Sequence, residues 1–246
     1  MSHNNSLVLA VDGSGVASFK HPSKEFCISG IITTTKNLTK INSRMSNVCK
    51  KYFSDPDVVL HFTEISRKIG IFDSLKDPLY ETGFWSDIIS VIENKEIMLV
   101  YGLADKDLIK SRGWQQITLA ERCYHSVIKN FFRILIKLKL KGQIVTESDL
   151  YTDDALIKIH NKFQSEGIPI LRVSSKKYHQ TVTSLSLVNK YNLDSLVQLA
   201  DLLGYISRKL YRVRQNKDES CDKLQLKLIR LIERKIKRKE VFYEVI

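Results

Sequence analysis

The chain has 246 residues, of which 43% are apolar and 27% charged, and its formal net charge is +12. Apolar content of this size offsets the entropy of ordering, which excludes disorder over most of the chain. The longest apolar run, residues 97–104, is far shorter than the roughly 18 residues of a membrane helix, and the N-terminus lacks the pattern of a secretory signal. We therefore expect a cytoplasmic protein with no membrane partner. The basic surplus favours nucleic acid as a partner.

Strands come first in the predicted order of elements. Residues 6–11 form an almost wholly apolar run that ends in a turn sequence, and residues 25–34 are rich in β-branched side chains. Further strands are predicted at residues 96–103, 143–146 and 168–173. Helices are predicted at residues 38–53, 79–94, 116–140, 153–166 and 195–211. This order indicates an α/β fold with a mixed, partly parallel sheet and helices on its faces.

The C-terminal part of the chain is strongly basic. Residues 207–240 contain 13 Lys and Arg against 5 Asp and Glu. Helical spacing places five cations on one face, which we call the basic stripe: Lys223, Lys227, Arg230, Arg234 and Lys237. The stripe is either the solvated back of a docked helix or a ridge that contacts phosphates. A membrane-surface helix ranks third, because no Trp or Phe lies on its apolar face.

Three acidic residues lie where an α/β sheet gathers them. Asp12 ends the first strand and Glu147 follows a later one, and ligands of open α/β sheets bind beyond the carboxyl ends of the strands. Asp201 lies on an otherwise apolar helix face that also carries Ala200 and Gly204. Such small residues let a helix approach a sheet closely. We therefore expect Asp12, Glu147 and Asp201 to be neighbours.

Two further acids are candidates for the same site. Glu64 follows His61 on a segment that enters or leaves the sheet, and Glu121 heads the apolar stripe of the helix predicted at 116–140. Structural interpretations stay open for several of these residues. Asp12 also suits a turn, Glu121 is favourable as a charge near a helix N-terminus, and His61 suits a structural role.

Clustered carboxylates repel one another, and a divalent cation relieves this repulsion. Oxygen ligands favour Mg²⁺ or Mn²⁺, and two such ions support phosphodiester hydrolysis. We therefore expect a metal-dependent nuclease that cleaves DNA or RNA. Its metal ligands are predicted to be Asp12, Glu147 and Asp201, with Glu64 or Glu121 completing the catalytic set.

The predicted nucleic-acid contacts come from several segments. Ser14 and Gly15 allow the backbone to approach a phosphate, and Lys176, Lys177 and the basic stripe hold the nucleic-acid strand. A non-catalytic module that binds nucleic acid or protein on the same fold is the alternative. An ATP-using phosphotransferase is disfavoured because its motifs are absent.

These motifs, in this order, resemble those of the bacterial and phage domain-of-unknown-function family 3800, a ribonuclease-H-like group. The segments that carry the resemblance are VDGSG at 11–15, HFTEI at 61–65, IVTES at 144–148 and VQLADL at 197–202. Gly13 stands where the family usually has Glu. The resemblance covers about residues 6–212 and implies metal-dependent nuclease chemistry.

The resemblance also implies a ribonuclease-H-like mixed sheet flanked by helices, to which the residue pattern adds helical insertions and a basic C-terminal helix. We expect a ribonuclease-H-like domain at 1–213, with a helical insertion at about 36–95, and a basic helical appendage at 214–246. A second copy of the chain or a regulatory protein is a further candidate partner.

Overall fold

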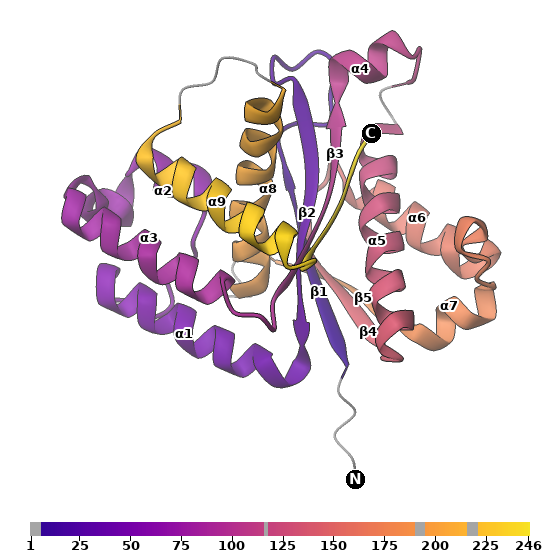
Figure 1. The fold of residues 1–246 in the computed structure, drawn as a ribbon, viewed down its shortest axis with the longest axis horizontal. Helices are drawn as coiled ribbons and strands as arrows, with labels where there is room; N and C mark the ends of the chain where they lie inside the picture. Colours follow the sequence, from indigo (N-terminus) through magenta and orange to yellow (C-terminus); the bar gives the residue numbers. More distant parts are fainter. Residues whose placement is uncertain (1–5, 116–117, 190–194, 216–220) are drawn as a thin grey trace.

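The computed structural model describes residues 6–115, 118–189, 195–215 and 221–246. In this part of the chain, one β-sheet lies between two layers of helices (Figure 1). The strands are β1 (Leu7–Ser14), β2 (Glu25–Thr34), β3 (Met98–Asp105), β4 (Gly142–Glu147), β5 (Val182–Val188) and β6 (Val241–Val245). The α-helices are α1 (Thr35–Phe53), α2 (Phe62–Arg67), α3 (Pro78–Ile92), α4 (Lys106–Ser111), α5 (Thr118–Leu138), α6 (Asp153–Glu166), α7 (Ser175–Thr181), α8 (Ser195–Arg214) and α9 (Lys223–Lys237). Two 3-10 helices are η1 (Gly70–Lys76) and η2 (Pro169–Leu171).

The strand order of the sheet is β5-β4-β1-β2-β3-β6. β1, β2 and β3 are successive antiparallel neighbours, whereas β4 pairs in parallel with β1 and β5 in parallel with β4. On the other side, β6 pairs in parallel with β3. The sheet is therefore mixed and partly parallel, as expected from the sequence. Because these three strands run in parallel, the carboxyl ends of β1, β4 and β5 lie at the same end of the sheet.

The structure differs from the sequence expectation at the margins of the sheet. Residues 168–173, expected as a strand, contain η2 and a single bridge between Ile168 and Val173. β5 is absent from the expected elements because it is a half-exposed edge strand rich in Ser and Thr. β6 is also absent from them, since its five residues follow a basic helix. The start of the helix expected at 116 lies outside the described residues.

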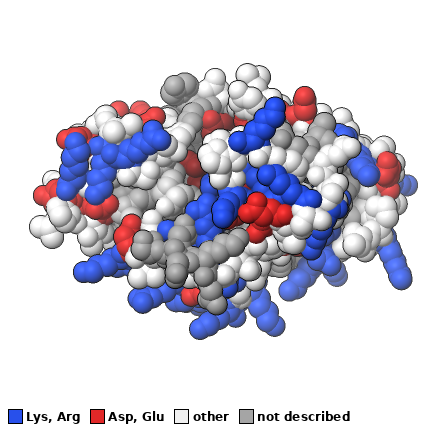
Figure 2. All heavy atoms as spheres, turned by 90° about the horizontal axis from the view of Figure 1, so that it is seen from above, with Lys and Arg blue, Asp and Glu red and all other residues white. Residues whose placement is uncertain are grey.

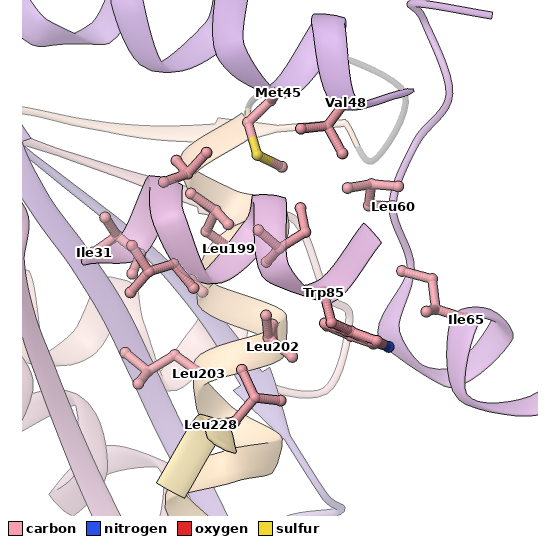
Figure 3. Close-up of a cluster of buried hydrophobic side chains, with 14 of the residues drawn as sticks. Ile31, Met45, Val48, Leu60, Ile65, Trp85, Leu199, Leu202, Leu203 and Leu228 are labelled. Atoms are coloured by element: carbon pink, nitrogen blue, oxygen red, sulfur yellow. The ribbon is translucent and has the colours of Figure 1, made fainter. Parts of the chain in front are cut away.

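Alternation along β1 divides the core between the two faces of the sheet. Val8 and Ala10 belong to the cluster packed with α1, α3 and α8, while Leu9 and Val11 belong to the cluster packed with α5 and α6. Figure 3 shows the first cluster, in which Met45 of α1 lies near Leu199 of α8. This alternation decides which face each acidic side chain can reach.

α8 lies very close to the sheet. The Ser29 hydroxyl of β2 donates to the Ala200 carbonyl of α8 at 2.8 Å, and this bond is buried. A Cβ at Gly204 would lie 2.7 Å from the Cβ of Ser14, closer than packed carbon atoms come. The small residues expected to allow close approach therefore do so, and they hold Asp201 beside β1.

The C-terminal segment packs into the fold. Leu228 and Ile232 of α9 belong to the same core cluster as α8, and β6 extends the sheet. Lys235 is fully buried, and its Nζ donates to the carbonyls of Asn94 and Ile97 and to Glu240. The domain boundary at residue 213 stays a prediction, but the described part of 214–246 is docked rather than separate. No helix in the described ranges is long and apolar enough to cross a membrane.

Candidate carboxylate site

One pocket lies at the carboxyl ends of β1, β4 and β5, beside α8. Three of the residues that line it are the acids expected to be neighbours, Asp12, Glu147 and Asp201. His61, Asn189 and Gln198 supply further polar groups. The pocket therefore gathers side chains from two strands, one helix and the segment that precedes α2.

The pleat of the sheet aims the strand acids at this pocket. Asp12 lies two residues beyond Ala10, on the face of β1 that packs against α8. Glu147 lies two residues beyond Val145, which contacts the same cluster. The carboxylate of Asp12 accepts a hydrogen bond from the Gly13 N–H at 2.7 Å. Both acids thus face α8 because of their place in the alternation.

Two side chains of α8 hold the segment that carries His61. Asp201 Oδ2 accepts from the Phe62 N–H at 2.9 Å, and Gln198 Oε1 accepts from the Leu60 N–H at 3.0 Å. His61 between them lines the pocket, and its Nδ1 is buried without a hydrogen-bond partner among the described residues. An unsatisfied buried polar atom is costly unless a ligand or water completes it.

Tyr124 of α5 lies on the other face of the sheet near Asp12. Burial raises the pKa of Tyr124 far above its usual range, and the negative charge of Asp12 adds to this shift. Its hydroxyl donates to Thr152 Oγ1 at 3.3 Å. Tyr124 therefore remains neutral and supports the end of β1 without carrying charge into the site.

The donor chemistry around the pocket fits a hard divalent cation, because carboxylate and amide oxygens are the ligands Mg²⁺ and Mn²⁺ prefer. In the described ranges, no three or more His, Cys, Asp or Glu side chains are arranged so that they could hold a metal ion. The acids are thus gathered around one pocket without forming a closed metal centre.

Glu121 and Glu64 do not lie with the other acids. Glu121 belongs to α5, which packs on the opposite face of the sheet, and its carboxylate pairs with Lys158 Nζ at 2.6 Å. Glu64 is exposed in the first turn of α2. The bond from Phe62 to Asp201 leaves His61, not Glu64, beside the pocket.

The predicted nucleic-acid contacts fall in three places. Ser14 and Gly15 lie at the end of β1, two to three residues beyond Asp12. Lys176 and Lys177 are exposed on α7, which precedes β5 and so lies at the opposite end of the strands from Glu147. The structure does not bring these two lysines to the pocket.

The basic stripe lies on the exposed side of α9. All five of its side chains are exposed, while Leu228, Ile229, Leu231 and Ile232 are buried on the other side. Within the stripe, Arg234 pairs with Glu93 at 2.9 Å. α9 is thus docked on the core by its apolar face, and its basic face is exposed to solvent. Contact between the basic stripe and phosphates stays a prediction.

Sequence reasoning leaves Asn189, Gln198 and Arg208 out of the site. Gln198 occupies the same helix face as Asp201, three residues earlier, so helical spacing alone could have identified it. Asn189 directly follows β5, an edge strand that the sequence does not reveal. Arg208 becomes significant only through its contact with Ser14, which no local pattern predicts.

No protein-family model and no curated protein matches the chain. Its fold is similar to that of solved structures that include Bst-RNase HIII in complex with Mn²⁺ and a mutant of Bst-RNase HIII. In both comparisons the identity is 8% and the TM-score 0.43, and 85% of this chain is covered. The chain spans little more than half of those structures, 57% and 56% of their lengths.

Proposed function

We propose that this protein is a divalent-metal-dependent nuclease that hydrolyses phosphodiester bonds of DNA or RNA. The observation that carries the proposal is the meeting of Asp12, Glu147 and Asp201 around one pocket at the carboxyl ends of the strands. Carboxylates that line one pocket repel one another, and a divalent cation among them relieves this repulsion. The net charge of +12 supports an anionic substrate.

Asp12, Glu147 and Asp201 would hold Mg²⁺ or Mn²⁺. When bound, the metal supplies Lewis-acid activation of water and of the scissile phosphate. The carboxylates then need to rotate toward the ion, because the described arrangement is not a closed metal centre. Gln198 keeps α8 and the His61 segment together during this change, because its amide oxygen accepts from the Leu60 N–H.

The test is cleavage of labelled single-stranded, double-stranded and hybrid oligonucleotides in Mn²⁺, Mg²⁺ or EDTA. We expect cleavage in metal, no cleavage in EDTA, and loss of cleavage in Asp201→Asn. Asp154→Asn, an exposed acid on α6, is the matched control and should cleave like wild type. Equal cleavage by wild type and Asp201→Asn points to a contaminant and contradicts the proposal.

A non-catalytic binding module is the second candidate function. Gly13 favours it, because the acid that the resembled family carries at this position is missing. Salt-sensitive oligonucleotide binding without cleavage in any metal, together with no calorimetric signal for Mn²⁺, supports the module over the nuclease.

A further inference from the structure

A second polar contact between β1 and α8 lies beside the carboxylate pocket. Ser14 follows Asp12 by two residues on the same face of β1, and Arg208 follows Asp201 by seven residues, two helical turns, on the same side of α8. Arg208 Nη1 donates to Ser14 Oγ at 3.2 Å. The Ser14–Arg208 pair therefore repeats the Asp12–Asp201 juxtaposition, displaced by about 7 Å along the strand and about 10 Å along the helix.

The guanidinium of Arg208 lacks the partners that such a group normally has. Its Nε is buried with no hydrogen-bond partner in the described residues, and within these ranges its one hydrogen bond is to a neutral hydroxyl. Burial lowers the pKa of Arg208, and the charge of Arg212 lowers it further. The buried Glu25 carboxylate offsets part of this effect. A half-buried guanidinium whose hydrogen bonds are incomplete is costly, unless an anion completes them when the protein works.

Neighbouring cations have partners of their own. Arg212 pairs with Glu25 at 2.6 Å, and Lys106 Nζ donates to the Ser23 carbonyl at 2.7 Å. These bonds fix Arg212 and Lys106 in structural roles and leave Arg208 as the guanidinium with unused donors. Figure 2 shows the molecule from above the view of Figure 1. Near the middle of this basic face, Lys and Arg side chains gather around a smaller group of acidic side chains.

At Gly15 an exposed stretch of backbone passes close to the guanidinium. Gly15 is exposed and has a φ of 86°, and a Cβ there would lie 3.2 Å from the Cζ of Arg208. The backbone therefore runs against the guanidinium without a side chain to cover it. An oxyanion fits this environment, because an Arg fork binds phosphate oxygens in bidentate fashion.

We propose that Arg208, together with the Ser14 hydroxyl and the uncovered backbone at Gly15, binds a backbone phosphate of a nucleic-acid strand next to the carboxylate pocket. This inference rests on the proposed function, because the same strand would cross both contacts. The alignment with Asp12 and Asp201 favours a strand phosphate over an isolated phosphate ion.

The test is fluorescence anisotropy with labelled single-stranded DNA and RNA in EDTA, over a range of salt concentrations. We expect Arg208→Gln to raise Kd about tenfold or more. The slope of log Kd against log salt should fall by about 0.7 to 0.9, the value for one phosphate. Arg208→Lys should keep the slope and recover part of the affinity, because it keeps the charge and loses the fork. Arg133→Gln removes an exposed charge from α5, on the opposite face, and should change neither quantity.

Several results would overturn the inference. One is an Arg208→Gln variant with wild-type Kd and salt slope. If Arg208→Gln does not fold, Arg208→Lys decides, and a wild-type Kd for it contradicts bidentate binding. Competition by inorganic phosphate beyond the effect of ionic strength assigns the site to the free ion. No binding by wild type also overturns the inference.

Failure of this inference is distinguishable from failure of the proposed function. Binding in EDTA does not depend on cleavage, so an Arg208-dependent Kd without nuclease activity supports the phosphate contact and contradicts the nuclease. Metal-dependent cleavage with no effect of Arg208→Gln on Kd supports the nuclease and removes the contact.

Discussion

At the residue scale, the surroundings of each acid separate a site residue from a structural one. Asp201 and Glu121 are both acids on helices that pack against the sheet. Asp201 accepts a backbone N–H beside two other carboxylates, whereas Glu121 pairs with the exposed Lys158. An exposed ion pair of this kind contributes little to stability. The two acids therefore have different predicted consequences when they are neutralised.

A buried histidine outside the site predicts a pH dependence of stability. His160 Nδ1 lies 2.9 Å from the Tyr178 hydroxyl, and burial lowers the pKa of His160 below its ordinary value of 6.5. The unfolded chain then takes up a proton at a higher pH than the folded chain does. We expect the free energy of unfolding to fall as pH drops below about 6.5, and to level off below the folded-state pKa.

Urea unfolding across this pH window measures the effect. His160→Gln should show a smaller decrease than wild type, although His125, whose pKa burial also lowers, keeps part of it. His21→Gln, at an exposed position between β1 and β2, is the control and should retain the full decrease. The same pH dependence in His160→Gln and wild type would contradict this assignment.

At the element scale, α8 is the platform of the site because it carries Gln198, Asp201 and Arg208 on the side that faces β1. Its distance from the sheet depends on Gly204, where a Cβ would lie 2.7 Å from Ser14 Cβ and 2.8 Å from Ser29 Oγ. An exposed helical Gly→Ala change normally stabilises a helix by about 1 kcal/mol. Here the close approach reverses the expected sign.

We expect Gly204→Ala to lower the free energy of unfolding by about 1–3 kcal/mol, the usual cost of overpacking. Chemical denaturation measures this change. Cleavage should also decrease, because moving α8 away from β1 separates Asp201 from Asp12. A variant as stable as wild type, or more stable, would show that the helix has room for the methyl group.

The basic stripe of α9 offers a second prediction at this scale. Lys227, Arg230 and Lys237 are exposed, while Leu228 and Ile232 anchor the helix on its other side. If the stripe contacts phosphates, replacing these three cations with Gln lowers oligonucleotide affinity. The salt slope then falls by about 2 to 3, without loss of stability. Unchanged affinity and slope in the triple variant identify the stripe as a solvated face.

At the scale of the whole molecule, the sequence predicts the centre of the fold better than its margins. β1, β4 and α8 are recognisable in the sequence, so Asp12, Glu147 and Asp201 are identifiable as acids at strand ends or on a buried helix face. β5 and β6 pair at the edges of the sheet, where half-exposed residues weaken the pattern. The roles of His61 and Arg208 depend on contacts across more than a hundred residues of chain, which local patterns do not encode.

The sheet also explains why Glu121 looks like a site residue in the sequence and lies elsewhere in the structure. The sheet separates the α8 layer from the α5 layer (Figure 1). Glu121 heads a buried stripe on α5, but that stripe packs against the face of the sheet opposite to Asp12 and Glu147. Sequence periodicity indicates a buried face without indicating which side of the sheet it covers.

The most direct test of the central claim compares initial cleavage rates in Mn²⁺ for wild type, Asp201→Asn and Glu121→Gln, prepared in the same way. The site on the α8 face predicts a loss of about a hundredfold or more for Asp201→Asn, and a rate within about twofold of wild type for Glu121→Gln because its ion pair is exposed. A large loss in Glu121→Gln, or a wild-type rate in Asp201→Asn, would contradict the assignment of the site to Asp12, Glu147 and Asp201.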